Sequence, residues 1–140
     1  MQTDIDSLRR FITNTPFMVD LGVDVLGGEP GRVRTEIVLQ PRHLQHTGVV
    51  HAGVMAALAD HTMGTAAQTL ASDEVWVLTA EFKINLLRGA RGERLFCEAW
   101  VIKPGRQLSF TEAEVYAIDA AGERQLCVKA SGTMALTARR

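Results

Sequence analysis

One carboxylate stands alone in a long stretch of this 140-residue chain that carries no other permanent charge. Between Arg42 and Asp73 lie 30 residues, and Asp60 is the only Asp, Glu, Lys or Arg among them. The same stretch holds all four histidines of the chain, which are His43, His46, His51 and His61. A partly buried carboxylate with few cationic neighbours is a stronger base than one in water. This pattern favours Asp60 as a catalytic base or nucleophile.

Asp60 also has structural interpretations, because such a carboxylate can face solvent, cap a neighbouring helix or lie at a subunit contact. The histidines raise a further alternative, a zinc-dependent hydrolase, since imidazole is a common zinc ligand. Their spacing is loose, however, and the His-Glu-x-x-His pattern of a zinc-binding helix is absent. We therefore expect no metal, and we expect hydrogen-bonded structural roles for His43 and His61.

The element that positions Asp60 is predicted to be a helix over residues 51–70, which are rich in Ala, Met, Leu, Gly and Thr. The segment is apolar on most sides, as is typical of a helix surrounded by protein. At about 100° per residue, one stripe of the helix consists of Gly53, Ala57, Asp60 and Gly64. The opposite, core-facing side consists of Met55, Leu58, Thr62 and Ala66.

The start of this helix is a second chemical element. The first N–H groups of a helix have no intrahelical acceptor, and the helix dipole makes this end partly positive. A carbonyl oxygen placed there would have its developing negative charge stabilised. Eight residues separate Ala52 from Asp60, which is about 12 Å of helical rise. One substrate carbonyl can use both ends only if the two residues come from different subunits.

The remaining elements are predicted from apolar periodicity and turn residues. A short helix is expected over residues 4–13, and strands over residues 17–26, 32–39, 75–87, 95–103, 109–118 and 125–136. In residues 75–87, strict alternation places Leu78, Phe82 and Ile84 on one face and Thr79 on the other. Short turns favour hairpins in a meander. The order predicts one α+β domain, residues 1–140, with an antiparallel sheet of about six strands wrapped around the central helix.

Composition narrows the function classes. The net charge of −1 argues against a nucleic-acid-binding protein. The chain has no run of 18 apolar residues and no secretory signal, so we expect no membrane span. Cys97 and Cys127 do not make a disulfide framework, which favours small core residues in a cytoplasmic protein. An apolar helix is hard to cover with one small chain, which predicts a homodimer or homotetramer.

A family resemblance is carried by residues 46–67, HTGVVHAGVMAALADHTMGTAA, which resemble the PaaI-like branch of the hotdog-fold acyl-CoA thioesterases. That branch has a His-Gly-Gly sequence, an apolar helix, and an acidic residue nine positions after the His. Here His51 begins His-Ala-Gly and Asp60 follows nine positions later. LTAEFKINLLRGA and GERLFCEAWVIKPGRQLSFTEAEV resemble the strands that follow, so the resemblance covers roughly residues 33–136. It implies the hotdog fold.

The resemblance also implies an activity, the hydrolysis of acyl-CoA thioesters to free acid and CoA. Coenzyme A is then part of the substrate, and no separate cofactor is expected. Asp60 matches the acid that attacks the thioester or activates water, and the Ala52 N–H matches the donor that polarises the thioester carbonyl. His51 matches the histidine at the helix mouth, Gln45 a position that helps to place the carbonyl or the water, and Thr79 a residue that orients water.

Two departures from the family pattern concern the site itself. Ala52 replaces the first glycine of His-Gly-Gly, and Gln45 stands where the family often has Asn. The N–H of Ala52 survives the change, but a methyl group enters the site, and a positive φ there would be strained. These departures motivate an alternative function, a non-catalytic hotdog protein that binds acyl-CoA.

Substrate binding requires further contacts, because coenzyme A carries phosphate groups. Gly53 completes the motif and is expected at the substrate. Cationic candidates lie in loops or at strand ends, at Arg88, Arg91, Lys103 and Arg106. Arg106 is preferred, because it follows a Pro-Gly turn that the resemblance places near the coenzyme. The alternative for each is a solvated surface charge. In the family the active site forms between two subunits, which would bring the distant helix ends together.

Overall fold

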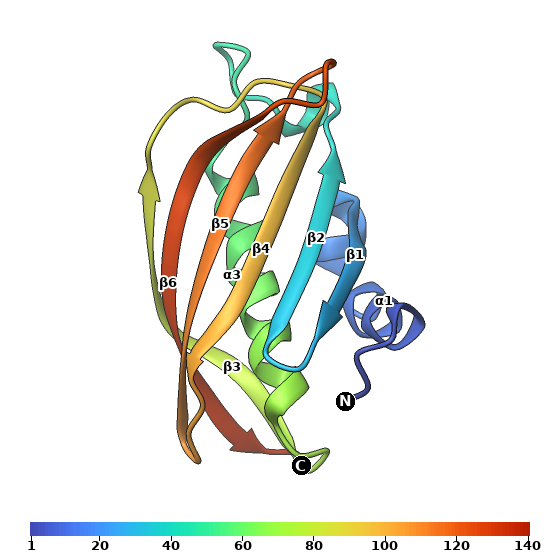
Figure 1. Cartoon of the computed structure of the whole chain (residues 1–140), viewed down its shortest axis with the longest axis vertical. Helices are drawn as coiled ribbons and strands as arrows, with labels where there is room; N and C mark the ends of the chain where they lie inside the picture. The colour runs from blue at the N-terminus through green and yellow to red at the C-terminus, as the bar shows by residue number, and fades with distance from the viewer.

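The computed structural model describes all of residues 1–140 (Figure 1). Two short helices, a β-hairpin and a single 3-10 turn precede one long helix, and four strands follow it. In chain order the elements are α1 (Ile5–Thr13), α2 (Pro16–Leu21), β1 (Val23–Glu29), β2 (Arg32–Val38), η1 (Pro41–His43), α3 (Ala52–Leu70), β3 (Val75–Leu86), β4 (Arg94–Lys103), β5 (Leu108–Ile118) and β6 (Arg124–Ala138). No helix combines the length and the apolar character needed to cross a bilayer.

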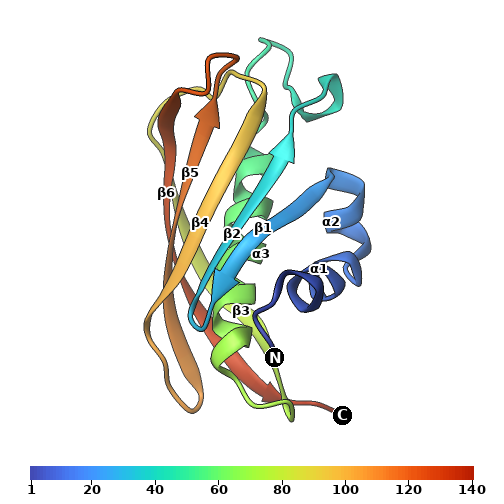
Figure 2. The same ribbon diagram turned by 45° about the vertical axis from the view of Figure 1, so that its right-hand side comes forward.

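The six strands form one antiparallel sheet in the order β1-β2-β4-β5-β6-β3. Figures 1 and 2 show α3 lying along one face of this curved sheet, as the sequence predicts. The meander of β4, β5 and β6 is confirmed, but the expected hairpin between β3 and β4 is wrong. β2 occupies the place beside β4, through pairs such as Arg32 with Trp100. β3 therefore pairs with β6 instead, and its other side is an edge of the sheet.

The strand expected over residues 17–26 begins only at Val23, because the preceding residues form the short helix α2. Pro16 stands in its first turn, where the missing N–H costs no hydrogen bond and the fixed φ suits a helix. Gly22 ends α2 at φ 79°, a left-handed conformation that glycine adopts without strain. The β-branched and apolar composition pointed to a strand, but Pro16 and Gly22 decide the local structure.

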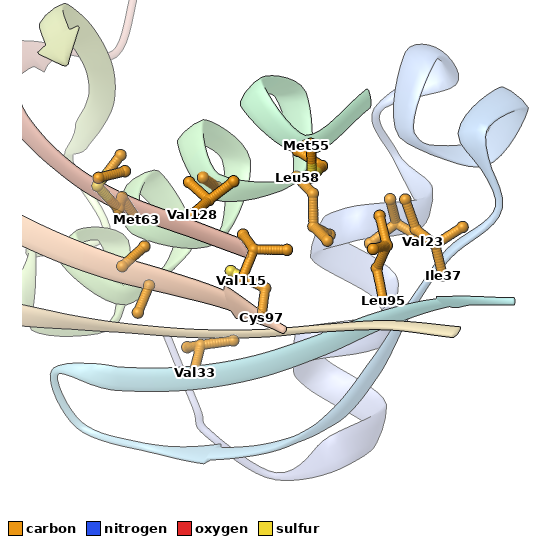
Figure 3. Close-up of a cluster of buried hydrophobic side chains, with 14 of the residues drawn as sticks. Val23, Val33, Ile37, Met55, Leu58, Met63, Leu95, Cys97, Val115 and Val128 are labelled. Carbon is orange, nitrogen blue, oxygen red and sulfur yellow. The ribbon is translucent and has the colours of Figure 1, made fainter. Parts of the chain in front are cut away.

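The predicted core-facing side of α3 is confirmed. Met55, Leu58, Thr62 and Ala66 are all 3 % exposed or less. Figure 3 shows Met55 and Leu58 of α3 beside Leu95 and Ile37 of the sheet. Within the core, the hydroxyls of Thr35 and Thr62 are hydrogen-bonded at 2.8 Å. Burial of apolar side chains on one face of α3 thus fixes the rotation of the helix and points the Asp60 side away from the sheet centre.

Both cysteines are small core residues, as predicted. Cys97 and Cys127 are fully buried and form no disulfide. Burial raises the pKa of the Cys97 thiol to about 12, against smaller opposing effects of hydrogen bonds from Thr62 and Thr35. A thiol in this state is almost entirely protonated at neutral pH, so it is a poor nucleophile.

A β-bulge in β3 changes which side chains of this strand face α3. The pairing with β6 shifts between Thr79 and Glu81, so that Ala80 is unpaired. Paired residues of antiparallel strands share a face, and Thr79 is paired with the buried Met134 while Phe82 is paired with the buried Gly132. Thr79 and Phe82 therefore lie on the same face. The predicted opposition of Thr79 to Phe82 is wrong, because strict alternation does not allow for the bulge.

Candidate active site

Asp60 and Thr79 are brought together by α3 and β3. The Oγ1 hydroxyl of Thr79 donates a hydrogen bond of 2.6 Å to Oδ1 of Asp60. Asp60 is half-buried, and it belongs to none of the ion pairs of the chain. The carboxylate is thus held by one neutral donor, and no cation competes for its second oxygen. Such a group is free to accept a proton from a bound water or to attack a carbonyl carbon.

A small hollow lies beside this pair. Its volume is about 160 Å³, and α1, α3 and β3 line it. The residues around it are Phe11, Asp60, His61, Gly64, Thr65, Val77, Leu78 and Thr79. Gly64 lies on the predicted small-residue stripe of α3, whereas Phe11 comes from a helix that the sequence does not connect to the site. The sequence-based reasoning therefore missed one wall of this hollow.

The start of α3 opens into a second, larger hollow of about 490 Å³. Gln45, His51, Ala52 and Arg88, which the sequence singles out, lie together around it. The N–H of Gly53 donates to Nδ1 of His51 at 2.8 Å, and the N–H of Val54 donates to the His51 carbonyl at 3.0 Å. The Ala52 N–H has no acceptor within the chain. Among the first three N–H groups of α3, it alone is free to bind a ligand.

Alanine at position 52, where the family has glycine, causes no strain from a positive φ. No residue other than glycine has a positive φ in this chain. Gly53 has a different importance, because a Cβ there would lie 3.0 Å from Nδ1 of His51. Glycine at this position therefore leaves room for the imidazole to fold back over the helix start and cap it.

The amide of Gln45 has a defined orientation. Its Oε1 accepts a hydrogen bond of 2.7 Å from the N–H of Thr47. This contact assigns the oxygen and leaves the NH2 group as the free end of the amide. Since Gln45 lines the same hollow as Ala52, the site contains two donors that a carbonyl oxygen or a water can use.

The four cationic candidates divide into two groups. Arg88 lines the hollow at the helix start and also an adjoining hollow with Arg91. Lys103 and Arg106 belong to the hairpin between β4 and β5, at the end of the sheet opposite the start of α3 (Figure 1). They line neither hollow described above. Within one chain, only Arg88 and Arg91 therefore lie near the helix mouth.

The histidines do not converge on a common point, and no three His, Cys, Asp or Glu side chains are grouped as metal ligands. The structural role predicted for His43 is confirmed, because its Nδ1 accepts from the Gln40 N–H at 3.0 Å and its Nε2 lies 2.8 Å from the Leu21 carbonyl oxygen. The hydrogen bond expected for His61 is not found. Its Nε2 is buried without a partner, and burial lowers the pKa of the ring against a smaller opposing effect of the Asp60 charge.

Comparison with known proteins identifies the family. Residues 47–122 match the Thioesterase superfamily. A crystal structure of a Thioesterase family protein from Silicibacter pomeroyi is 34% identical with a TM-score of 0.91, over 96% of this chain and 98% of that one. The chain therefore belongs to the thioesterase superfamily, and its fold is the α+β hotdog-like fold that the resemblance predicted.

Two further relatives extend this comparison. The provisionally named esterase SSO1253 of Saccharolobus solfataricus is 29% identical over 81% of this chain and 72% of its own length. Thioesterase HI1161 of Haemophilus influenzae is 20% identical, with a TM-score of 0.86 over 99% of this chain and 93% of that one. At this identity the second comparison concerns the fold alone. The chain is thus a thioesterase or esterase by family.

Proposed function

We propose that this protein hydrolyses acyl-CoA thioesters to the free acid and CoA, as a member of the PaaI-like branch. The observation that carries the proposal is the Asp60 carboxylate, which is free of cations and held at 2.6 Å by the Thr79 hydroxyl. The second support is the unpaired N–H of Ala52 at the start of the same helix. Base and oxyanion donor are the two groups that thioester hydrolysis requires.

Asp60 has two possible roles in the reaction, and both balance. As a base, it takes a proton from water while the water oxygen bonds to the thioester carbon; the C–S bond then breaks, and the thiolate of CoA leaves and takes up the proton. As a nucleophile, its oxygen bonds to the same carbon and expels the thiolate, and water then hydrolyses the resulting anhydride. Thr79 holds one carboxylate oxygen in either case, which leaves the other for the reaction.

The Ala52 N–H and the Gln45 amide NH2 are proposed to donate to the thioester oxygen as it becomes negative. Removal of one such donor typically costs about 2.7–4 kcal/mol of transition-state stabilisation. Arg88 and Arg91, which form no ion pairs, lie beside this hollow and are the proposed contacts for CoA phosphates. Arg106 and Lys103 are candidates only through a second subunit.

The complete site is proposed to form between two copies of the chain. The free edge of β3 runs antiparallel to α3, from Val77, whose N–H bonds Gln68 near the end of α3, to Leu86, which lines the helix mouth. Leu78 and Leu86 are 57 % and 52 % exposed on this strand. A long, apolar, unpaired edge strand is a ready site for pairing with another chain.

Antiparallel pairing of two β3 edges about a two-fold axis would solve the distance problem along α3. In this pairing Thr79 of one chain lies toward the Leu86 end of the partner strand, and Asp60 therefore lies toward Ala52 of the partner subunit.

Light scattering at micromolar concentration is expected to give a dimer or tetramer. Leu78→Lys should release monomers without activity. Val38→Lys is the matched control, because Val38 is equally exposed, at 56 %, but lies on an inner strand.

The activity is tested by CoA release from short, medium and aromatic acyl-CoAs. Asp60→Asn should lower kcat by about 10²–10⁴-fold, the usual contribution of a general base. Asp20→Asn, at an exposed carboxylate of α2, should have no effect. Unchanged turnover in Asp60→Asn would overturn the assignment.

Subunit mixing tests the shared site. Ala52→Pro removes the proposed donor N–H at the first helical position, where proline is well tolerated, and His51 already has the extended conformation (ψ 134°) that precedes proline. Ala52→Pro and Asp60→Asn should each be inactive alone. Refolding them together should restore activity through mixed dimers, whereas a site within one chain predicts no recovery.

Ala52 and Gln45 differ from the family pattern, and this difference supports a second candidate function, the non-catalytic binding of acyl-CoA. It predicts that calorimetry detects acyl-CoA binding by the wild-type protein while no thioester of the panel is hydrolysed. Hydrolysis at rates that depend on Asp60 would exclude this alternative.

A further inference from the structure

The hollow beside Asp60 has a back wall made by an unexpected pair of rings. Phe11 of α1 and His61 of α3 are stacked, with centroids 6.2 Å apart and planes inclined by 23°. His61 directly follows Asp60 in the helix, so the stack lies next to the carboxylate. Both rings line the hollow of about 160 Å³.

The hollow is lined by polar and apolar residues, and two of the polar ones, His61 and Thr65, have hydrogen-bonding atoms that are covered or already paired. The Nε2 atom of His61 is covered and has no hydrogen-bond partner. The Thr65 hydroxyl donates to the His61 carbonyl at 2.8 Å and so is already satisfied. Phe11, Val77 and Leu78 supply carbon surface to the hollow beside the polar Asp60 and Thr79. Carbon surface next to a reactive carboxylate suits an acyl chain.

Gly64 provides space in the same hollow. A Cβ built on Gly64 would meet no atom within 4 Å. Glycine lowers the stability of a helix interior relative to alanine, yet nothing in the packing around Gly64 excludes a side chain. The space beside Gly64 is therefore available to a ligand bound in the hollow.

We propose that this hollow is the acyl pocket, that Phe11 stacked on His61 closes its end, and that Gly64 sets its width. The inference rests on the proposed thioesterase function. A dry cavity of about 150 Å³ holds a benzene molecule, so the pocket takes an acyl group of about six carbons or one aromatic ring. The edge-strand residues Leu78 and Thr79 lie where a second copy would complete the pocket, but α1 and α3 supply the wall.

Two substitutions should shift the acyl preference in opposite directions. Phe11→Ala removes six ring carbons from the wall, while Leu8 and Ile12, both at most 1 % exposed, still anchor α1. It should raise the ratio of kcat/KM for decanoyl-CoA over butyryl-CoA by about tenfold or more. Gly64→Val fills the pocket and should lower the ratio for hexanoyl-CoA over acetyl-CoA by about tenfold. Phe17→Ala, at a phenylalanine that is 59 % exposed on α2, is the matched control and should change neither ratio.

These ratios do not depend on the fraction of folded enzyme, so partial unfolding of a variant does not obscure the result. Phe11→Leu gives a smaller enlargement and should fall between wild type and Phe11→Ala. If the wild-type protein hydrolyses acyl-CoAs and both ratios stay within about twofold of wild type in all variants, the pocket assignment is wrong while the thioesterase function stands. If the wild-type protein hydrolyses no acyl-CoA, the proposed function fails, and this inference fails with it.

Discussion

A carbon atom added to Gly53 would lie 3.0 Å from Nδ1 of His51, the same atom that accepts the Gly53 N–H at 2.8 Å. The two residues therefore form one capping unit at the start of α3. This unit takes up the Gly53 N–H and leaves the Ala52 N–H as the free donor at the helix mouth. In this arrangement the histidine caps the helix end, and the neighbouring Ala52 N–H is left without a partner beside the hollow that Ala52 lines.

Loss of this cap should reduce stability. His51→Ala removes the acceptor of the Gly53 N–H and should lower the free energy of unfolding by about 0.5–2 kcal/mol, the usual range for a helix N-cap. Urea unfolding followed by circular dichroism measures the difference. His46→Ala, at an exposed histidine without hydrogen bonds in the chain, should leave stability unchanged. An equal loss in both variants would contradict the capping role.

The Thr79 hydroxyl should matter to catalysis through its contact with Asp60. Thr79→Val keeps the shape of the side chain but removes the 2.6 Å hydrogen bond. Hydrogen bonds to charged groups contribute about 1.5–3 kcal/mol, so kcat should fall by roughly 10- to 100-fold. Thr79→Ser retains the hydroxyl and should recover most of the activity. Equal kinetics of the Val and Ser variants would show that the contact has no part in turnover.

His61 should make the protein less stable in acid. Burial holds the pKa of its ring below the value of about 6.5 that it has in an unfolded chain. Below about pH 6.5 the unfolded chain binds more protons at this residue than the folded chain does. The free energy of unfolding therefore has its full value above about pH 6.5 and falls as the pH drops toward the lowered pKa. His61→Leu should therefore weaken the decline in unfolding free energy between pH 7.5 and pH 5.5. An identical decline in both proteins would contradict this.

The same variant should also be more stable at neutral pH. A buried polar atom without a partner typically costs about 1–3 kcal/mol, and Nε2 of His61 is such an atom. His61→Leu removes this atom while keeping a side chain of similar length against Phe11. Chemical unfolding at pH 7.5 is expected to show an increase in unfolding free energy, and a decrease would mean that the imidazole has an unseen stabilising contact.

The thiols should be protected in the folded state. Cys97 has a pKa raised to about 12 by full burial, and burial also raises the pKa of Cys127. Because the thiolate is the reactive form, neither residue should react with iodoacetamide at pH 8 until the chain unfolds. Mass spectrometry before and after addition of denaturant measures this. Rapid labelling of the native protein would show that the β4 or β6 region opens readily.

Sequence patterns were sufficient for the features set by local periodicity. The composition of residues 51–70 predicted α3 and its core-facing side, and two members of the predicted small-residue stripe, Asp60 and Gly64, line the small hollow. The position of β3 beside β6 and the approach of Phe11 to His61 were not predictable in this way. Both depend on contacts between segments far apart in the chain, and no short spacing in the sequence records them.

The unpaired residue Ala80 determines whether the Thr79 hydroxyl and the apolar side chains that follow it in β3 lie on the same face of the strand. In an unbroken strand, Thr79 and Phe82 would point in opposite directions, and the chain would have to give up either the hydroxyl beside Asp60 or the apolar row toward the helix mouth. The bulge shifts the phase of β3 by one residue and keeps both on one side. Regular pairing of Ala80 with β6 would turn either Thr79 or Phe82 away from α3, whereas deletion of Ala80 would leave the two residues two positions apart, on the same face of a regular strand.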